Sequence, residues 1–261
     1  MNLLSEIVSS KQRRVDQAKK LVPLEQMRAL ASEAREDAKA HTLLKALSDE
    51  SKIHIIAEFK RRSPSKGEIK RDADPVSTAR AYESAGAAAV SVLTEEDYFG
   101  GSLDDLRAAR NAISLPILRK DFIFDDYQVY ESAAAGADAV LLIVAALDDE
   151  ALVRLRRITE DELGMDALVE VHTADEMRRA AACGAQIIGV NNRDLQTFTV
   201  SLETSVQLAP LAPKGSVLIS ESGIESAGDI RRLRSSGYRA FLIGESLMRA
   251  DDPEALLRSF L

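Results

Sequence analysis

Four charged residues lie where simple packing of an apolar core would not place them. Glu58 and Lys60 end the segment HIIAEFK, and side-chain alternation puts both on one face of a strand. Lys120 ends LPILRK, and Glu170 lies inside the apolar segment LVEV. An unpaired buried carboxylate costs several kcal/mol or shifts its pKa, so Glu170 requires a cationic partner or a chemical task. Lysine and glutamate together supply the donors and acceptors of general acid–base catalysis.

Polar residues follow three further apolar segments in the same way. Asn191 and Arg193 come after IIGV, Glu221 and Ser222 after LIS, and Glu245 after LIG. One charged residue just past a strand is usually a solvated loop residue. Six segments with polar residues at the same end are stronger evidence, because the ends of parallel strands meet and build one site.

Four other charged residues have a simpler interpretation. Arg61, Arg62 and Arg119 lie beside predicted strand ends. We expect these arginines to be solvated loop residues. Asp121 is expected to serve a turn or a helix cap.

A repeat of glycines indicates which elements position these residues. Gly86, Gly136, Gly184 and Gly237 each follow a helical pattern and precede an apolar run, at spacings of 50, 48 and 53 residues. Glycine ends a helix readily because it adopts the left-handed conformation without a Cβ clash. Nearly unbroken apolar runs are typical of strands covered on both faces. Four more strands are predicted between these runs, at 54–60, 115–122, 166–171 and 216–223.

Eight strand–helix units of about 25 residues each fit the chain from residue 51 onward. We therefore predict an α/β fold, a (β/α)8 TIM barrel over residues 51–261, with an N-terminal helical extension over residues 1–50. A doubly wound open sheet is the alternative. The barrel is favoured because no long segment remains for a sheet edge or a second domain.

Two of the predicted strands end in glycine-bearing turns, SESGI and LIGESL. Backbone N–H groups at such turns, and at the helix that follows, bind phosphate. Barrels frequently hold a phosphate after strands seven and eight. Gly223 and Gly244 could instead only permit tight turns, but their occurrence in two consecutive segments favours a phosphate site.

The composition limits the partners. The net charge of −8 argues against nucleic acid as the main partner, although one local basic pocket remains compatible with it. No apolar run approaches the roughly 18 residues that span a bilayer. A single cysteine, Cys183, cannot form an intrachain disulfide, which fits a cytoplasmic protein. The three histidines lack the spacing of metal ligands, and no metal site is predicted.

Several motifs together resemble the indole-3-glycerol phosphate synthase family. They are AEFKRRSPSKG, LPILRKDFIF, LVEVH, IIGVNNRDL, LISESGI and FLIGESLM, and the resemblance covers essentially the whole chain. It implies an enzyme of tryptophan biosynthesis that closes a ring with loss of carbon dioxide and water. The implied substrate is 1-(2-carboxyphenylamino)-1-deoxyribulose 5-phosphate, and no metal or organic cofactor is implied.

The resemblance also implies roles for the charged residues. Lys120 is the expected general acid. Lys60 is expected to bind the phosphate or the carboxylate, or to act as a second acid in the dehydration. Glu58 and Glu170 are candidates for the base, or for holding the lysines in place.

Binding residues follow from the same resemblance. Asn191 and Glu221 are expected at the sugar hydroxyls, with pairing to a lysine as an alternative for Glu221. Arg193 and Ser63 are expected to contact the substrate carboxylate or to shape its pocket. Phe99 and Phe122 are expected at the aromatic ring, with ordinary core packing as the alternative. The expected phosphate-binding residues are Lys60, Ser222, Gly223, Gly244 and Glu245. Glu245 stands where some members have serine, and a backbone N–H contact would survive that change.

Two other classes of function remain open at this point. Another phosphosugar barrel enzyme would share the last two glycine turns, but it would not explain AEFKRRSPSKG or LRKDF. A non-catalytic scaffold would have lost the charges at the strand ends, which are intact here. The chain is expected to be a monomer or a homodimer.

Overall fold

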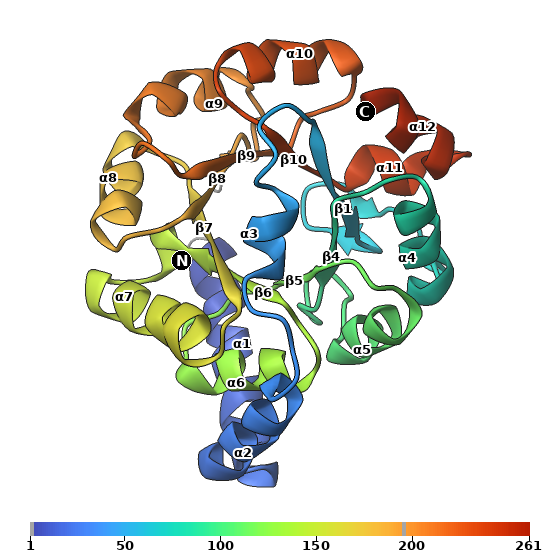
Figure 1. Cartoon of the computed structure of the whole chain (residues 1–261). Helices are drawn as coiled ribbons and strands as arrows, with labels where there is room; N and C mark the ends of the chain where they lie inside the picture. Colours follow the sequence, from blue (N-terminus) through green and yellow to red (C-terminus); the bar gives the residue numbers. More distant parts are fainter. Residues whose placement is uncertain (1–2, 195–196) are drawn as a thin grey trace.

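A closed barrel of eight parallel strands forms the centre of the molecule (Figure 1). The computed structural model describes residues 3–194 and 197–261. Residues 1 and 2 of the extension and Leu195 of the IIGVNNRDL motif lie outside the described residues. The barrel strands are β1 (His54–Phe59), β4 (Ala89–Leu93), β5 (Ile117–Lys120), β6 (Ala139–Ile143), β7 (Asp166–Val171), β8 (Ile187–Asn191), β9 (Val217–Glu221) and β10 (Ala240–Ile243). β1 closes the ring by pairing with both β10 and β4, which excludes the open sheet and confirms the predicted barrel.

Helices surround the barrel and connect its strands. They are α4 (Pro75–Ser84), α5 (Leu103–Ala112), α6 (Asp126–Ala134), α7 (Asp149–Arg157), α8 (Ala174–Ala182), α9 (Glu203–Leu208), α10 (Ala227–Ser235), α11 (Glu245–Arg249) and α12 (Pro253–Phe260). Three short turns accompany them: η1 (Val144–Ala146), the π-helical η2 (Ile158–Glu162) and η3 (Ala209–Leu211). Many helices begin at a side chain that accepts a backbone N–H, as Asp125 does at α6 and Ser226 at α10.

The four repeated glycines follow α4, α6, α8 and α10. Gly86, Gly136, Gly184 and Gly237 have φ angles of 95°, 90°, 82° and 101°. These values lie in the left-handed region that ends a helix, as the sequence pattern predicted.

The burial of the strands explains their unbroken apolar sequences. Every residue of the eight barrel strands is buried except Lys120 and Asn191, which are half-buried. These two residues are the last of β5 and β8. The exceptions to burial therefore lie at the carboxyl ends of strands, where barrels carry their active sites.

The N-terminal extension contains α1 (Leu3–Leu21), α2 (Leu24–Arg35) and α3 (Thr42–Ala46). α1 and α2 pack against α6 on the outside of the barrel, whereas α3 crosses its amino-terminal end (Figure 1). Leu43 and Leu47 are fully buried in the cluster that fills the barrel. Oδ2 of Asp166, the first residue of β7, accepts the backbone N–H groups of Leu43 and Leu44 at 2.9 and 3.1 Å. The extension thus closes one end of the barrel.

A short hairpin follows β1. Its strands are β2 (Arg62–Ser63) and β3 (Gly67–Glu68). Gly67 has a φ of 66°, so a glycine suits this turn. Separately, no helix in the described part of the chain is long and apolar enough to cross a membrane.

Candidate active site

A cavity of about 770 Å³ opens at the carboxyl ends of the barrel strands. Every site residue predicted from the sequence lines it, although these residues come from strands far apart in the chain. They are Glu58, Lys60, Ser63, Phe99, Lys120, Phe122, Glu170, Asn191, Arg193, Glu221, Ser222, Gly223, Gly244 and Glu245. The polar strand ends therefore build one pocket.

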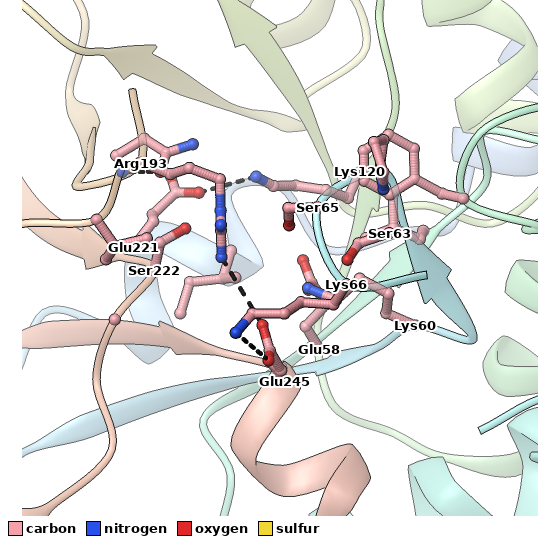
Figure 2. Close-up of a pocket in the computed structure, with 18 of the residues that line it drawn as sticks. Glu58, Lys60, Ser63, Ser65, Lys66, Lys120, Arg193, Glu221, Ser222 and Glu245 are labelled. Carbon is pink, nitrogen blue, oxygen red and sulfur yellow. Dashed lines mark hydrogen bonds and ion pairs between the residues drawn. The ribbon is translucent and has the colours of Figure 1, made fainter. Parts of the chain in front are cut away.

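Lys120 lies at the centre of the charged part of the pocket (Figure 2). Its Nζ donates to Oε2 of Glu221 at 2.8 Å and to Oε2 of Glu170 at 3.0 Å. Both glutamates are buried. Of the two alternatives for Glu221, the structure has the pairing with a lysine.

Burial and the attraction of opposite charges shift the pKa values of Lys120, Glu170 and Glu221 in opposite directions. Burial lowers the pKa of the Lys120 ammonium, but the carboxylates of Glu170, Glu221 and Glu58 outweigh it and raise that pKa above its usual value. Burial alone would raise the pKa of Glu170, yet Lys120 and His172 lower it. Burial raises the pKa of Glu221 to about 7, because the attraction of Lys120 is partly offset by the charge of Glu170. Lys120 and Glu170 are thus ionised at neutral pH, while Glu221 titrates there.

The second lysine has its own carboxylate. Nζ of Lys60 donates to Oε1 of Glu58 at 2.5 Å, and Glu58 is buried. A Cβ on Gly244 would lie 2.4 Å from Oε1 of Glu58, and a Cβ on Gly189 would lie 2.1 Å from Oε1 of Glu221. Each glycine therefore leaves space for a carboxylate that lines the pocket.

The turn after β9 has an unusual backbone. Ser222 and Gly223 have φ angles of 67° and 77°, and a serine seldom adopts this left-handed conformation. Nδ2 of the buried Asn192 donates to the carbonyl oxygens of Glu221 and Ser222 at 3.0 and 3.1 Å. Asn192 thereby holds the turn in which the phosphate site is predicted.

Three cations surround the carboxylate of Glu245. Lys66 and Arg193 each lie 3.7 Å from it (Figure 2). Arg249 lies 3.5 Å from it. Only Arg193 was predicted as a site residue. Lys66 comes from the turn of the hairpin and Arg249 from the end of α11. Neither residue directly follows a barrel strand, and that position is what predicted the other site residues. The lysine of SPSKG was the available signal for Lys66.

An apolar wall faces these charges. The rings of Phe99 and Phe122 lie 6.1 Å apart between centroids. The Glu95 carboxylate accepts the backbone N–H groups of Phe99, at 3.0 Å, and of its two preceding neighbours. Leu3 and Ile7 of α1 also line the cavity. The extension thus contributes to the pocket as well as closing the opposite end of the barrel.

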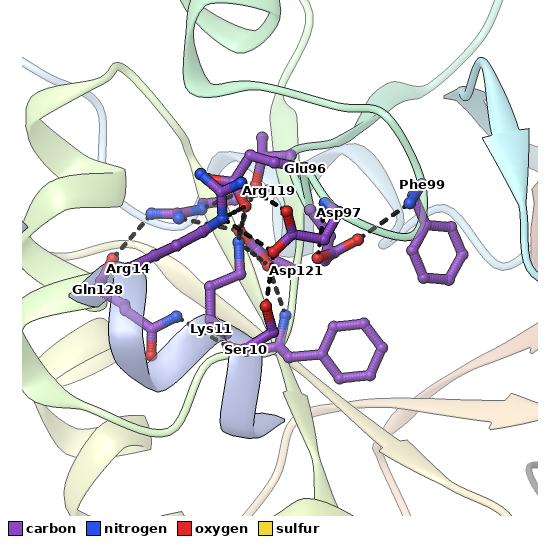
Figure 3. Close-up of polar contacts among 12 residues, drawn as sticks. Ser10, Lys11, Arg14, Glu96, Asp97, Phe99, Arg119, Asp121 and Gln128 are labelled. Atoms are coloured by element: carbon purple, nitrogen blue, oxygen red, sulfur yellow. Dashed lines mark hydrogen bonds and ion pairs between the residues drawn. The ribbon is translucent and has the colours of Figure 1, made fainter. Parts of the chain in front are cut away.

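A buried ionic network connects α1 to the strand that carries Lys120 (Figure 3). Lys11 is 3% exposed, and its Nζ lies 2.9 Å from Oδ1 of Asp121 and 2.5 Å from Oε2 of Glu96. Asp121 also accepts Arg119 Nη2 at 3.0 Å and the Thr94 hydroxyl at 2.6 Å. Burial raises the pKa of Asp121, but Lys11 and Arg119 more than compensate and lower it. Asp121 therefore serves a buried network instead of only a turn.

Two expectations about the arginines are wrong. Arg119 is 2% exposed and also donates to Glu131, because its strand position points it toward α6 instead of solvent. Arg61 is half-buried, and it donates to both carboxylate oxygens of Asp105 at 2.5 and 2.8 Å. Arg62 is exposed, as expected.

The comparison with protein families decides the assignment. The model of the family described as indole-3-glycerol phosphate synthase matches residues 4–260. The chain belongs to the indole-3-glycerol phosphate synthase family. Named members include the synthase of Carboxydothermus hydrogenoformans, 48% identical with 99% of each chain covered. The synthase of Syntrophobacter fumaroxidans is also 48% identical, with 98% of this chain and 96% of that protein covered.

Solved structures outside the indole-3-glycerol phosphate synthase family share the fold. The 3-hexulose-6-phosphate synthase of Salmonella typhimurium matches with a TM-score of 0.64 at 13% identity, over 80% of this chain and 96% of that one. A thiamine phosphate pyrophosphorylase from Pyrococcus furiosus matches with a TM-score of 0.61 at 15% identity, over 82% and 95%. At these identities the likeness concerns the barrel alone.

Proposed function

We propose that this chain is an indole-3-glycerol phosphate synthase acting on 1-(2-carboxyphenylamino)-1-deoxyribulose 5-phosphate. One observation carries the proposal: Lys120 is a half-buried ammonium held between the buried carboxylates of Glu170 and Glu221 at the mouth of the barrel. The Lys120 ammonium is a positioned proton donor, and the two carboxylates beside it differ in pKa. General acid–base catalysis requires such a set of groups.

The first step forms a carbon–carbon bond. The aromatic carbon that carries the carboxylate attacks the ketone carbon of the ribulose chain, and Lys120 donates a proton to the ketone oxygen. An alkoxide is a stronger base than a lysine amine, so this transfer is favourable despite the raised pKa of Lys120. Carbon dioxide then leaves, and its bonding electrons restore the aromatic ring.

The second step removes water. The new hydroxyl leaves with a proton from a lysine, while a carboxylate takes a proton from the adjacent methylene carbon. This forms the double bond of the indole. Lys60 paired with Glu58, and Lys120 paired with Glu170, are the two acid–base pairs available for it. Overall, the substrate loses one carbon dioxide and one water.

The rest of the pocket suits the rest of the substrate. The aromatic ring suits the apolar wall that Phe99 and Phe122 form together, and the buried Ser63 hydroxyl, which has no partner in the described protein, is free to bind the substrate. The phosphate fits the turns at Ser222, Gly223 and Gly244, near Lys66 and Arg193. A chain with a single cysteine also suits the reducing cytoplasm in which we place this enzyme.

The test follows indole fluorescence after adding the proposed substrate. The chain has no tryptophan, so the protein contributes little background. We expect product formation by the wild type, and a turnover lower by about 10²–10⁴ in Lys120→Ala, the usual contribution of a general acid.

Lys52→Ala is the matched control. Lys52 lies before β1 at the opposite end of the barrel, with a 71% exposed side chain, and its loss should leave turnover unchanged. Absence of product from folded wild-type protein would refute the proposed activity. Near-normal turnover in Lys120→Ala would refute the role of that lysine.

A further inference from the structure

His172 lies directly after β7 and bridges two carboxylates. Its side chain is 10% exposed. Nδ1 lies 3.3 Å from Oε2 of Glu176, and Nε2 lies 3.5 Å from Oε1 of Glu170. The other oxygen of Glu170 accepts Lys120. The four groups therefore form a row from α8 to the centre of the pocket: Glu176, His172, Glu170 and Lys120.

Glu176 fixes the position of the ring. Its Oε2 accepts the backbone N–H of His172 at 2.7 Å as well as facing Nδ1. Nε2 is buried, and it faces the Glu170 carboxylate just beyond hydrogen-bond length. A small movement of Glu170 would complete that hydrogen bond.

The geometry determines which charge state suits this ring. A neutral imidazole carries one N–H and one lone pair, whereas an imidazolium carries two N–H groups. With a carboxylate oxygen on each side, a neutral ring would turn a lone pair toward an anion. Only the imidazolium presents a donor to both.

The surrounding charges act in the same direction. Glu170 faces the ring from its own strand, Glu176 from α8 and Glu221 from β9, while Lys120 of β5 lies on the far side of Glu170. Burial lowers the pKa of His172, but the hydrogen bond to Glu176 and the charges of Glu170 and Glu221 outweigh it and raise that pKa.

We propose that His172 is a positioning residue that, as an imidazolium, orients Glu170 and keeps it ionised beside Lys120. The proposal deepens the proposed function, because it assumes that ionised Glu170 acts in the reaction. Removing the imidazolium would raise the pKa of Glu170, since one of the two cations that lower it would be gone. The ionised fraction of Glu170 would then fall at a higher pH.

The experiment compares kcat and KM of the wild type and His172→Gln from about pH 3.5 to pH 9, because the lowered pKa of Glu170 places its acidic limb below the usual carboxyl range. We expect kcat to fall about 10-fold in the variant, KM to change little, and the acidic limb of the kcat profile to move up by about half to one pH unit. Glu176→Gln, which leaves the histidine in place but lowers its pKa, should move the limb in the same direction by less.

His41→Gln is the matched control. His41 also faces a carboxylate, with Nδ1 3.1 Å from Oδ1 of Asp166, but at the closed end of the barrel. Its profile should coincide with that of the wild type. An unmoved acidic limb in His172→Gln, or an equal shift in His41→Gln, would overturn the proposal.

A spectroscopic readout separates this proposal from the activity. Nitrogen-15 chemical shifts of the histidine rings distinguish imidazolium from neutral imidazole without any turnover. We expect His172 of the wild type to be the imidazolium at neutral pH, and a neutral ring would overturn the proposal. If the wild type formed no indole product, the proposed function would fail on its own, and the charge of His172 would still be decided by these shifts.

Discussion

At the residue scale, the pocket places one ammonium between two buried carboxylates. Nζ of Lys120 binds both Glu170 and Glu221, and burial penalises each charge. Lys120 keeps Glu170 ionised but cannot fully satisfy both partners, so the pKa of Glu221 stays raised to about 7. A raised carboxyl pKa means that the ionised form destabilises the folded state relative to the unfolded chain.

The cost of ionised Glu221 predicts that a neutral substitution at this position makes the protein more stable but less active. Because the folded-state pKa of Glu221 exceeds that of the unfolded chain, ionised Glu221 destabilises the fold at pH 8, and the penalty disappears as the pH falls toward about 5. Glu221→Gln should therefore stabilise the protein at pH 8 by on the order of 2 kcal/mol and hardly at all near pH 5, while turnover falls.

Thermal unfolding at the two pH values measures the effect. Glu33→Gln, on the exposed surface of α2, serves as the control and should behave like the wild type at both. A lower melting temperature for Glu221→Gln at pH 8 would show that the pair with Lys120 outweighs the cost of burying the second carboxylate.

At the element scale, α1 is connected to the pocket through ions. Lys11 reaches Asp121, which lies between Lys120 and Phe122, and Asp121 Oδ1 accepts the backbone N–H of Phe122 at 2.8 Å. Arg14, from the same helix, binds Asp97 in the loop that carries Phe99. One helix therefore holds both the lysine strand and the aromatic wall (Figure 3).

Removing the charge of Lys11 should disturb the site more than the fold. In Lys11→Met the methylene stem remains, Asp121 keeps Arg119 and Thr94, and the protein should stay folded. The end of β5 and the loop before Phe99 would lose their common anchor, and small displacements of catalytic groups are costly. We expect kcat/KM to fall about 5- to 50-fold.

Steady-state kinetics beside a melting curve test this role. Lys20→Met, an exposed lysine of the same helix, is the control and should match the wild type in both. If Lys11→Met lowered the melting temperature but left kcat/KM unchanged, the network would contribute to stability alone.

At the scale of the whole molecule, the extension acts on both ends of the barrel. α1 lines the open mouth, whereas Leu43 of α3 and Leu47 directly after it fill the amino-terminal end. The two ends are separated by the packed interior of the barrel. Stability and catalysis should therefore respond to different parts of the same extension.

Truncating the buried leucine of α3 should destabilise without altering the site. Leu43 is fully buried, and Leu43→Ala should cost about 2–5 kcal/mol, lowering the melting temperature by roughly 5–15 °C. Leu30→Ala, on a 42% exposed leucine of α2, should change it little. Kinetic constants at 25 °C should stay within about two-fold of the wild type, and a large loss of kcat/KM in folded Leu43→Ala would contradict the separation of the two ends.

Much of the fold and of the candidate site follows from local patterns. The glycine spacing predicts the strand–helix repeat because each glycine ends a helix through its own backbone conformation. Polar residues at strand ends, such as Glu58, Lys120 and Asn191, identify the open end of the barrel. Side-chain alternation along a strand and the direction of the chain can both be read from a short segment. The family resemblance adds the expected roles.

Only the tertiary structure decided which charges meet. Lys120 and Glu221 are 101 residues apart, and Lys11 and Asp121 are 110 apart, so no local pattern predicts either pair. Arg119 was expected in solvent because its segment does not reveal Glu131, the acidic partner that α6 brings to it. Proton affinity likewise depends on burial and on distances through space, which is why the raised pKa of Glu221 emerges only when the barrel is closed.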